Sequence, residues 1–272
     1  MNNNPIAVFD SGLGGLSVVR HLRQLLPAED IVYFGDTARV PYGTKSRRTV
    51  ATFAKEDARF LLQFEPKLIV VACNTVSAIA MDELEAEIPV PIVGVLKPGA
   101  EAAVCLAQGA PIGVIGTEAT VSSNAYCRAI EAISPGALVI QQACPLFVPI
   151  VEEGRACTDA VVRHAARGYL ASLRDQGVRV VVLGCTHYPL LRDAIAAVLG
   201  PKVAIVDSGE ATSHAVEALL TASGALSSPD RTGTMRAFVS DHPARFRMVG
   251  SRFLNHDIED VQLVEPERYI HS

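Results

Sequence analysis

The sequence has little charge and no cluster of basic residues. Charged residues make up 19% of its 272 positions, tryptophan is absent, and the net charge is −5. Arg47-Arg48 is the only adjacent pair of basic residues. A groove for nucleic acid needs clustered Lys and Arg side chains to neutralise phosphates, so no nucleic-acid partner is expected. Mild acidity of this kind is typical of a soluble protein.

Long apolar runs and a leader segment are also missing. The chain begins Met1-Asn2-Asn3-Asn4-Pro5 and enters the apolar run Ile6–Phe9 without a basic segment. No stretch reaches the roughly 18 consecutive apolar residues that span a bilayer. We therefore expect no signal peptide, no membrane contact and a cytoplasmic location.

Cysteine pairs of the CxxC type are absent, which argues against a zinc site or a thioredoxin-like motif. In the cytoplasm the six cysteines are expected to stay mostly reduced, and no metal site is predicted. Cys105 and Cys127 lie in Ala-rich helical patterns, so we interpret both as packing residues. The cysteines are Cys73, Cys105, Cys127, Cys144, Cys157 and Cys185.

Signatures of the common cofactors are missing too. Gly12-Leu13-Gly14-Gly15 is not the GxGxxG pattern of dinucleotide-binding proteins, and there is no P-loop. A pyridoxal cofactor needs a lysine Schiff base and a phosphate cup. Lys45 lies near the turn at Tyr42-Gly43, but no partner pattern accompanies it. We therefore predict that the chain uses no cofactor.

The chain does contain short apolar strands that alternate with helices. This alternation predicts α/β architecture with largely parallel sheets. The expected strands are Ile6–Phe9, Ile31–Phe34, Leu68–Ala72, Ile92–Val95, Ile112–Ile115, Leu138–Gln141, Val178–Leu183, Val203–Val206 and Phe238–Ser240. Expected helices include Leu16–Leu26, Arg47–Gln63, Val76–Glu87 and Asp159–Asp175, and Ser223–Thr234 is the best candidate for a mobile surface loop.

The two halves of the chain also resemble each other weakly. Val70–Thr75 parallels Val182–His187, and each segment has a cysteine at the end of a strand. We predict two similar domains, each a mostly parallel sheet flanked by helices, related by a pseudo-twofold axis with the site at their interface. Residues 1–98 with 208–272 would form the first domain, and residues 99–207 the second. The alternative is that any two βα units look alike.

Cys73 and Cys185 are the candidate chemical groups. In open α/β sheets, ligands bind beyond the carboxyl ends of the strands, where both cysteines are expected. A helix N-terminus there favours the thiolate. A single cysteine in this place is usually only a small buried hydrophobic residue. Two in matching positions, each followed by polar residues, favour a functional pair.

Two facing thiols suit the inversion of a carbon centre. Racemisation removes a proton from one face of an α-carbon and returns a proton to the other, which one group cannot easily do. A thiolate on one side and a thiol on the other solve this geometry, and two such groups titrate as a coupled pair. Only about 3% of an ordinary cysteine is thiolate at pH 7, so the site must favour the charged form of one.

Five motifs resemble those of glutamate racemases and occur in the family's order over residues 9–209. The tail beyond about residue 223 matches no motif. The motifs are Phe9–Val18, Tyr33–Gly43, Ala72–Thr75, Gly184–Leu190 and Val206–Gly209. The resemblance implies a cofactor-independent isomerase that supplies D-glutamate for peptidoglycan, with Cys73 acting on the D-isomer and Cys185 on the L-isomer.

The same resemblance assigns further site residues. Glu152 resembles a family position that supports His187. By their chemistry, Asp10 could orient the substrate ammonium or serve Cys73 as a base, and His187 could do the same on the side of Cys185. The substrate would contact Asp10, Ser11, Pro41, Tyr42, Gly43, Asn74, Thr75, Thr117, Thr120, Thr186 and His187. Each has a structural alternative: Asp10 as a helix cap, His187 as a capping or core histidine, and Thr117 and Thr120 as turn or cap residues.

Other functions stay open at this point. An aspartate or hydantoin racemase would use the two cysteines in the same way, and rates on a substrate panel discriminate. A non-catalytic protein that binds a small acidic ligand would need neither thiol. A thiol hydrolase could pair Cys185 with His187 but leaves Cys73 unexplained. A site between domains also favours a homodimer that restrains domain motion.

Overall fold

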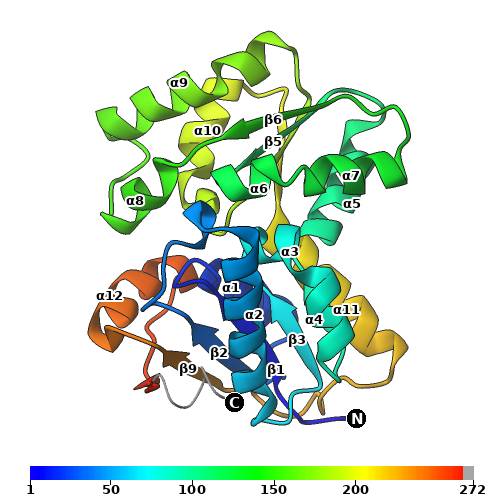
Figure 1. The fold of residues 1–272 in the computed structure, drawn as a ribbon, viewed down its shortest axis with the longest axis vertical. Coiled ribbons are helices and arrows are strands. Elements are labelled where there is room, and N and C mark those ends of the chain that lie inside the picture. The colour runs from blue at the N-terminus through cyan, green and yellow to red at the C-terminus, as the bar shows by residue number, and fades with distance from the viewer. Residues whose placement is uncertain (266–272) are drawn as a thin grey trace.

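The computed structural model describes residues 1–265, which form two lobes, each built on a parallel sheet (Figure 1). The larger sheet has the strand order β10-β9-β2-β1-β3-β4 and the smaller one β6-β5-β7-β8. The strands are β1 Ile6–Asp10, β2 Ile31–Gly35, β3 Leu68–Val71, β4 Ile92–Gly94, β5 Ile112–Gly116, β6 Val139–Ala143, β7 Val180–Gly184, β8 Ala204–Asp207, β9 Met235–Val239 and β10 Val261–Leu263.

Helices flank both sheets, as the alternating pattern predicts. They are α1 Leu16–Leu25, α2 Arg47–Leu62, α3 Asn74–Ile79, α4 Met81–Glu87, α5 Leu96–Ala107, α6 Glu118–Ser122, α7 Ala125–Ile133, α8 Phe147–Glu152, α9 Ala160–Asp175, α10 Arg192–Leu199, α11 Ser208–Ala222 and α12 Pro243–Leu254. Two 3₁₀ turns, η1 Tyr42–Thr44 and η2 Tyr188–Leu191, complete the elements. No helix within residues 1–265 is long and apolar enough to cross a membrane.

The two sheets repeat one topology. β2-β1-β3-β4 in the first corresponds to β6-β5-β7-β8 in the second, and all registered pairs are parallel. The chain therefore reverses its strand order beside β1 and beside β5, where sites form in such sheets. The predicted fold class is confirmed. The domain limits at residues 98 and 207 remain our proposal, because α5 packs against both α7 and α11.

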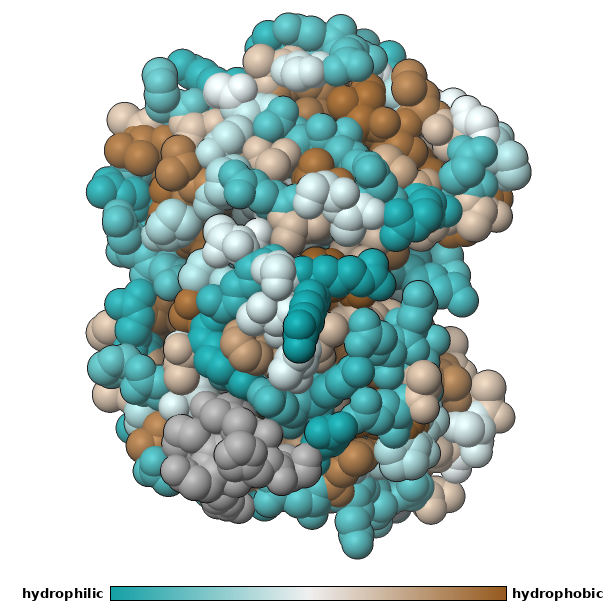
Figure 2. Space-filling view, viewed as in Figure 1, coloured by the Kyte–Doolittle hydropathy of each residue, from teal (hydrophilic) through white to brown (hydrophobic). Residues whose placement is uncertain are grey.

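Burial on both faces explains the continuous apolar strands. Along β1, Ile6 and Val8 join one hydrophobic core, while Ala7 and Phe9 join the other. A parallel strand covered by helices on both sides needs apolar side chains at every position. Figure 2 shows the waist between the lobes and more hydrophobic surface on the upper lobe, which holds the smaller sheet.

Several sequence predictions need correction. The helix expected over Val76–Glu87 is two helices, α3 and α4, which meet at Ala80. Cys105 is exposed and is no packing residue, because Ala103 and Ala107 occupy the buried face of α5. Cys127 is half-buried, so it packs only in part.

The segment 223–234 is a surface loop, as predicted, and hydrogen bonds at Ser227 and Thr234 tie it to the rest of the lobe. Ser227 is buried, and its hydroxyl donates to Glu29 Oε2 at 2.8 Å. Glu29 also pairs with the buried Lys67, and the Thr234 amide donates to Asp30 Oδ1 at 2.7 Å. Buried charges of this kind must be paired, so the loop is held where they meet.

Candidate active site between the two sheets

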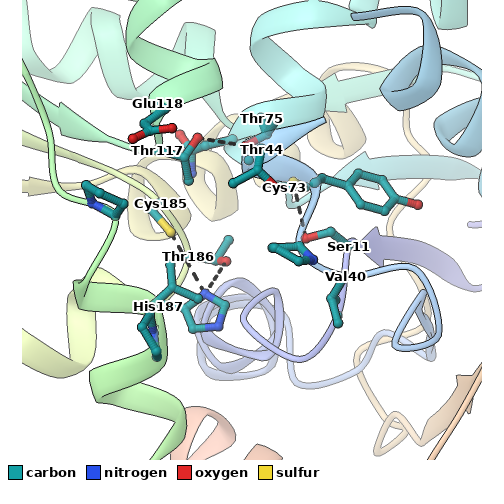
Figure 3. Close-up of a pocket in the computed structure, with 18 of the residues that line it drawn as sticks. Ser11, Val40, Thr44, Cys73, Thr75, Thr117, Glu118, Cys185, Thr186 and His187 are labelled. Carbon is teal, nitrogen blue, oxygen red and sulfur yellow. Dashed lines mark hydrogen bonds between the residues drawn. The ribbon is translucent and has the colours of Figure 1, made fainter. Parts of the chain in front are cut away.

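One cavity of about 340 Å³ lies between the lobes, where the carboxyl ends of β1, β3, β5 and β7 converge (Figure 3). It receives residues from both sheets. It is lined by Ser11, Gly12, Val40, Pro41, Tyr42, Gly43, Thr44, Cys73, Asn74, Thr75, Thr117, Glu118, Pro145, Val148, Pro149, Glu152, Cys185, Thr186 and His187. Almost all of the residues predicted from the sequence therefore meet at one place.

Asp10 and Thr120 are the two predicted residues outside this lining. Both are buried, Asp10 at the end of β1 and Thr120 in α6. Thr120 shares hydrogen bonds with Thr117 at 2.9 Å and Thr75 at 3.4 Å, so it supports two residues of the wall. Direct substrate contact by either residue stays a prediction.

Cys73 lies in a buried, acidic setting. It is the N-cap residue of α3, and its thiol donates to Ser11 Oγ at 3.7 Å. Burial, and next the negative charge of Asp10, raise the pKa of Cys73 to about 12. Hydrogen bonds from Val76 and Ser11 offset these effects only in part. A pKa raised in this direction favours the protonated thiol of Cys73 over the thiolate.

Asp10 carries an unused acceptor. Its Oδ2 accepts a hydrogen bond from the Gly12 amide at 2.9 Å, while its Oδ1 has no partner in the described part of the chain. Burial raises the pKa of Asp10, and the positive charge of His187 acts in the opposite direction. A buried oxygen without a partner is costly, which indicates that a ligand or a proton completes this group.

Cys185 lies in a setting of opposite charge. Its Sγ is 3.9 Å from His187 Nδ1, and His187 Nε2 donates to Glu152 Oε1 at 3.1 Å. Burial alone lowers the pKa of His187, but Cys185, Glu152 and Asp10 outweigh it and raise the pKa to about 10. The hydrogen bond to His187 lowers the pKa of Glu152. The positive charge of the His187 ring therefore lies beside the sulfur atom of Cys185.

Figure 3 shows the two cysteines entering the cavity from different strands, with Ser11 beside Cys73 and His187 beside Cys185. Cys73 follows β3 and Cys185 follows β7, which are equivalent strands of the two sheets. The match between their sequence settings therefore has a structural basis.

Two glycines let the lobes approach each other. A Cβ atom on Gly14 would lie 2.3 Å from Thr186 Oγ1 and 2.6 Å from the His187 ring. One on Gly43 would lie 2.9 Å from Thr117 Cβ. Gly14 is thus explained by close packing across the lobes, and no phosphate cradle is needed to account for the glycine-rich segment.

Thr117 and Tyr42 line the cavity and also make hydrogen bonds that stabilise the surrounding structure. Thr117 caps α6 by accepting from the Thr120 amide at 3.2 Å, and it also lines the cavity. Its role as a cap residue is therefore confirmed, and its contact with the substrate stays a prediction. The Tyr42 hydroxyl bonds to Asp36 and, at 3.0 Å, to Asp57. That hydroxyl is therefore already hydrogen-bonded to two carboxylates of the protein.

Asn74 connects the lobes. Its Nδ2 donates to Ser208 Oγ at 3.3 Å, and its Oδ1 accepts from the buried Tyr126 hydroxyl at 2.7 Å. These contacts fix the amide beside Cys73 and tie α3 to α7 and α11.

Seven lining residues were not predicted from the sequence: Gly12, Val40, Thr44, Glu118, Pro145, Val148 and Pro149. Thr44 and Glu118 adjoin predicted residues, so a wider window around the motifs would have found them. Pro145 could have been found from its position, because it follows β6 at the same edge of the sheet as the predicted residues.

Known proteins resemble the whole chain. Residues 6–216 match the family described as Asp/Glu/Hydantoin racemase. A protein named glutamate racemase from Geobacter metallireducens is 49% identical over 96% of this chain and 97% of its own length. One of the same name from Chlorobaculum tepidum is 47% identical over 97% of both chains.

A solved structure has the same fold. The glutamate racemase of Francisella tularensis, described in complex with D-glutamate, superposes with a TM-score of 0.91 at 39% identity. The match covers 99% of this chain and 100% of that one. The resemblance inferred from the five motifs and the enzyme class that they imply are confirmed, and the chain belongs to the Asp/Glu/Hydantoin racemase family.

Proposed function

We propose that this chain interconverts L-glutamate and D-glutamate without a cofactor, using Cys73 and Cys185 as the proton-transfer pair. D-glutamate made in this way would supply peptidoglycan synthesis. The observation that carries the proposal is a thiol from each sheet in one cavity, one beside Asp10 and one beside the His187 imidazole. The relatives named glutamate racemase support the choice of substrate.

Proton transfer in the L-to-D direction would start at Cys185. Its thiolate removes the α-proton and becomes a thiol, while the C–H electron pair spreads into the α-carboxylate. Cys73 then gives its proton to the opposite face of the carbon and becomes a thiolate. The reverse direction starts from a thiolate at Cys73. Each turnover therefore exchanges the protonation states of the two cysteines, and a proton must return from Cys185 to Cys73 before the next L-to-D turnover.

The polar lining suits an amino acid with two carboxylates. Four residues with hydroxyl or amide groups, Ser11, Asn74, Thr75 and Thr186, line the cavity, and none of its described lining residues is Lys or Arg. Neutral donors aimed at the α-carboxylate would stabilise the charge that develops there, with His187 as the nearby cation. Asp10 Oδ1 would accept from the thiol of Cys73 or from the substrate ammonium.

Incubation of the pure chain with L-glutamate in deuterated water tests the proposal. Optical rotation should fall to zero and deuterium should enter the α-position with no cofactor added. A folded sample that does neither would refute the function. Full activity of either Cys73→Ala or Cys185→Ala would refute the two-thiol mechanism.

The family description also includes aspartate and hydantoin substrates. Initial rates on aspartate, hydantoins and glutamate decide between them, and we expect glutamate to be fastest. A protein that only binds an acidic ligand would keep its affinity in both cysteine variants and exchange no protons. We further propose a cytoplasmic homodimer, which light scattering of the pure chain tests for assembly.

A further inference from the structure

The last helix of the larger lobe, α12, reaches the site from outside every recognised motif. It follows β9, which pairs with β2, and it lies beyond the residues that match the family. In Figure 1 it lies directly below α8 of the upper lobe. α8 ends at Glu152, the acceptor for His187.

Three contacts join α12 to this part of the site. Arg245 Nη2 donates to Glu152 Oε2 at 3.4 Å, leaving Oε1 to His187. Arg252 Nη1 donates to the Val151 carbonyl at 3.1 Å, at the end of α8. The Phe253 ring packs edge-on against His187, with the ring centroids 5.2 Å apart.

Glu152 has a different partner on each carboxylate oxygen, and these two contacts fix the plane of the carboxylate. A carboxylate with one partner can rotate about its last torsion, whereas one with a partner on each oxygen cannot do so freely. Glu152 in turn holds the orientation of the His187 ring, and with it the direction in which Nδ1 faces Cys185. The chain of contacts therefore runs from Arg245 through Glu152 and His187 to one sulfur, and Cys73 has no part in it.

We propose that Arg245 is a positioning residue for the half-reaction of Cys185, acting through Glu152 and His187. The inference rests on the proposed racemase function and deepens it. Removal of Arg245 loosens Glu152 and raises the barrier for proton removal from the L-isomer. The barrier on the Cys73 side stays as it was.

Enantiomers have equal free energies, so kcat/KM must fall by the same factor in both directions. Primary isotope effects separate the two barriers. With α-deuterated L-glutamate the label is removed by Cys185, and with α-deuterated D-glutamate by Cys73. For Arg245→Gln we expect kcat/KM to fall about three- to fivefold, the range of a partly exposed ion pair. The isotope effect on kcat/KM should rise from the L-isomer and fall from the D-isomer.

A double-mutant cycle with Glu152→Gln tests the route. Arg245→Gln should cause no further loss once Glu152→Gln is present, because the contact is already broken. Arg245→Lys, which keeps the charge, should recover part of the rate. Arg247→Gln removes the same charge from the exposed side of α12 and should leave rate and isotope effects unchanged.

Equal losses from Arg245→Gln with and without Glu152→Gln would overturn the proposal, as would isotope effects that do not change in opposite directions. If Arg247→Gln lowers kcat/KM as much as Arg245→Gln does, the effect comes from the net charge of α12 and the proposal is wrong. If the wild-type chain racemises a different substrate, the function proposed above fails. The same cycle run on that substrate still decides the role of Arg245.

Discussion

The two halves of the site share one pattern and differ in charge. Each places a cysteine after the third strand of its sheet. Cys73 has the buried carboxylate of Asp10 as its neighbour, whereas Cys185 has the imidazole of His187. This asymmetry suits the proposed reaction, which needs one thiol and one thiolate, because two similar backbones place groups of opposite charge beside the two sulfur atoms.

Removal of one thiol at a time tests the difference between the Cys73 half and the Cys185 half most directly. Either Cys→Ala change should lower racemisation at least about a thousandfold, within the range of lost acid–base groups. In deuterated water, Cys73→Ala should still wash deuterium into L-glutamate without inversion, through Cys185. Cys185→Ala should exchange D-glutamate far more slowly, because the pKa of Cys73 is about 12. Proton NMR of the α-position measures both rates, and equal rates would contradict the charge asymmetry.

Gly14→Ala should disturb the Cys185 half through sterics alone. The added methyl group would overlap Thr186 and the His187 ring, so these groups or the whole lobe must move. We expect kcat/KM to fall about a hundredfold, as for a displacement of about 1 Å in a catalytic group. Gly168→Ala is the matched control, since a Cβ atom there meets no neighbour within 4 Å. A fully active Gly14→Ala enzyme would show that this close approach is unimportant.

His187→Asn should sharpen the comparison by removing the positive charge while keeping a polar side chain. Loss of the positive charge beside Cys185 should lower kcat about tenfold, which corresponds to about 1.4 kcal/mol in the activation barrier. The pH–rate profile should move to higher pH. Steady-state rates from pH 6 to 10 in both directions provide the measurement, and an unchanged profile would exclude His187 as the charge that assists Cys185.

The last prediction concerns stability. The pKa of His187 rises on folding from 6.5 to about 10, so the folded state holds this proton more tightly. The resulting stabilisation is complete below pH 6.5 and is lost as the pH rises to about 10. The melting temperature should therefore fall more steeply between pH 6.5 and pH 10 in the wild type than in His187→Asn. Parallel curves for the two proteins would contradict the raised pKa.

The sequence anticipated the parts of the site that local pattern encodes. The strand ends and their polar followers, Cys73-Asn74-Thr75 and Cys185-Thr186-His187, were visible because buried parallel strands are apolar throughout and stop abruptly. The break of one expected helix at Ala80 was invisible, since its composition suits a continuous helix. The anchored loop at Ser227 was invisible too, because its partners lie about 200 residues away.

The sequence by itself determined the α/β class, the repeat of the strand–cysteine unit and most of the residues around the cavity. These follow from hydrophobic periodicity and from motifs whose residues are close in the chain. Only the tertiary structure decided that both cysteines share one cavity between the lobes, and that Arg245 of α12 reaches Glu152. Charge environment and burial depend on residues brought together from distant segments, which no local pattern records.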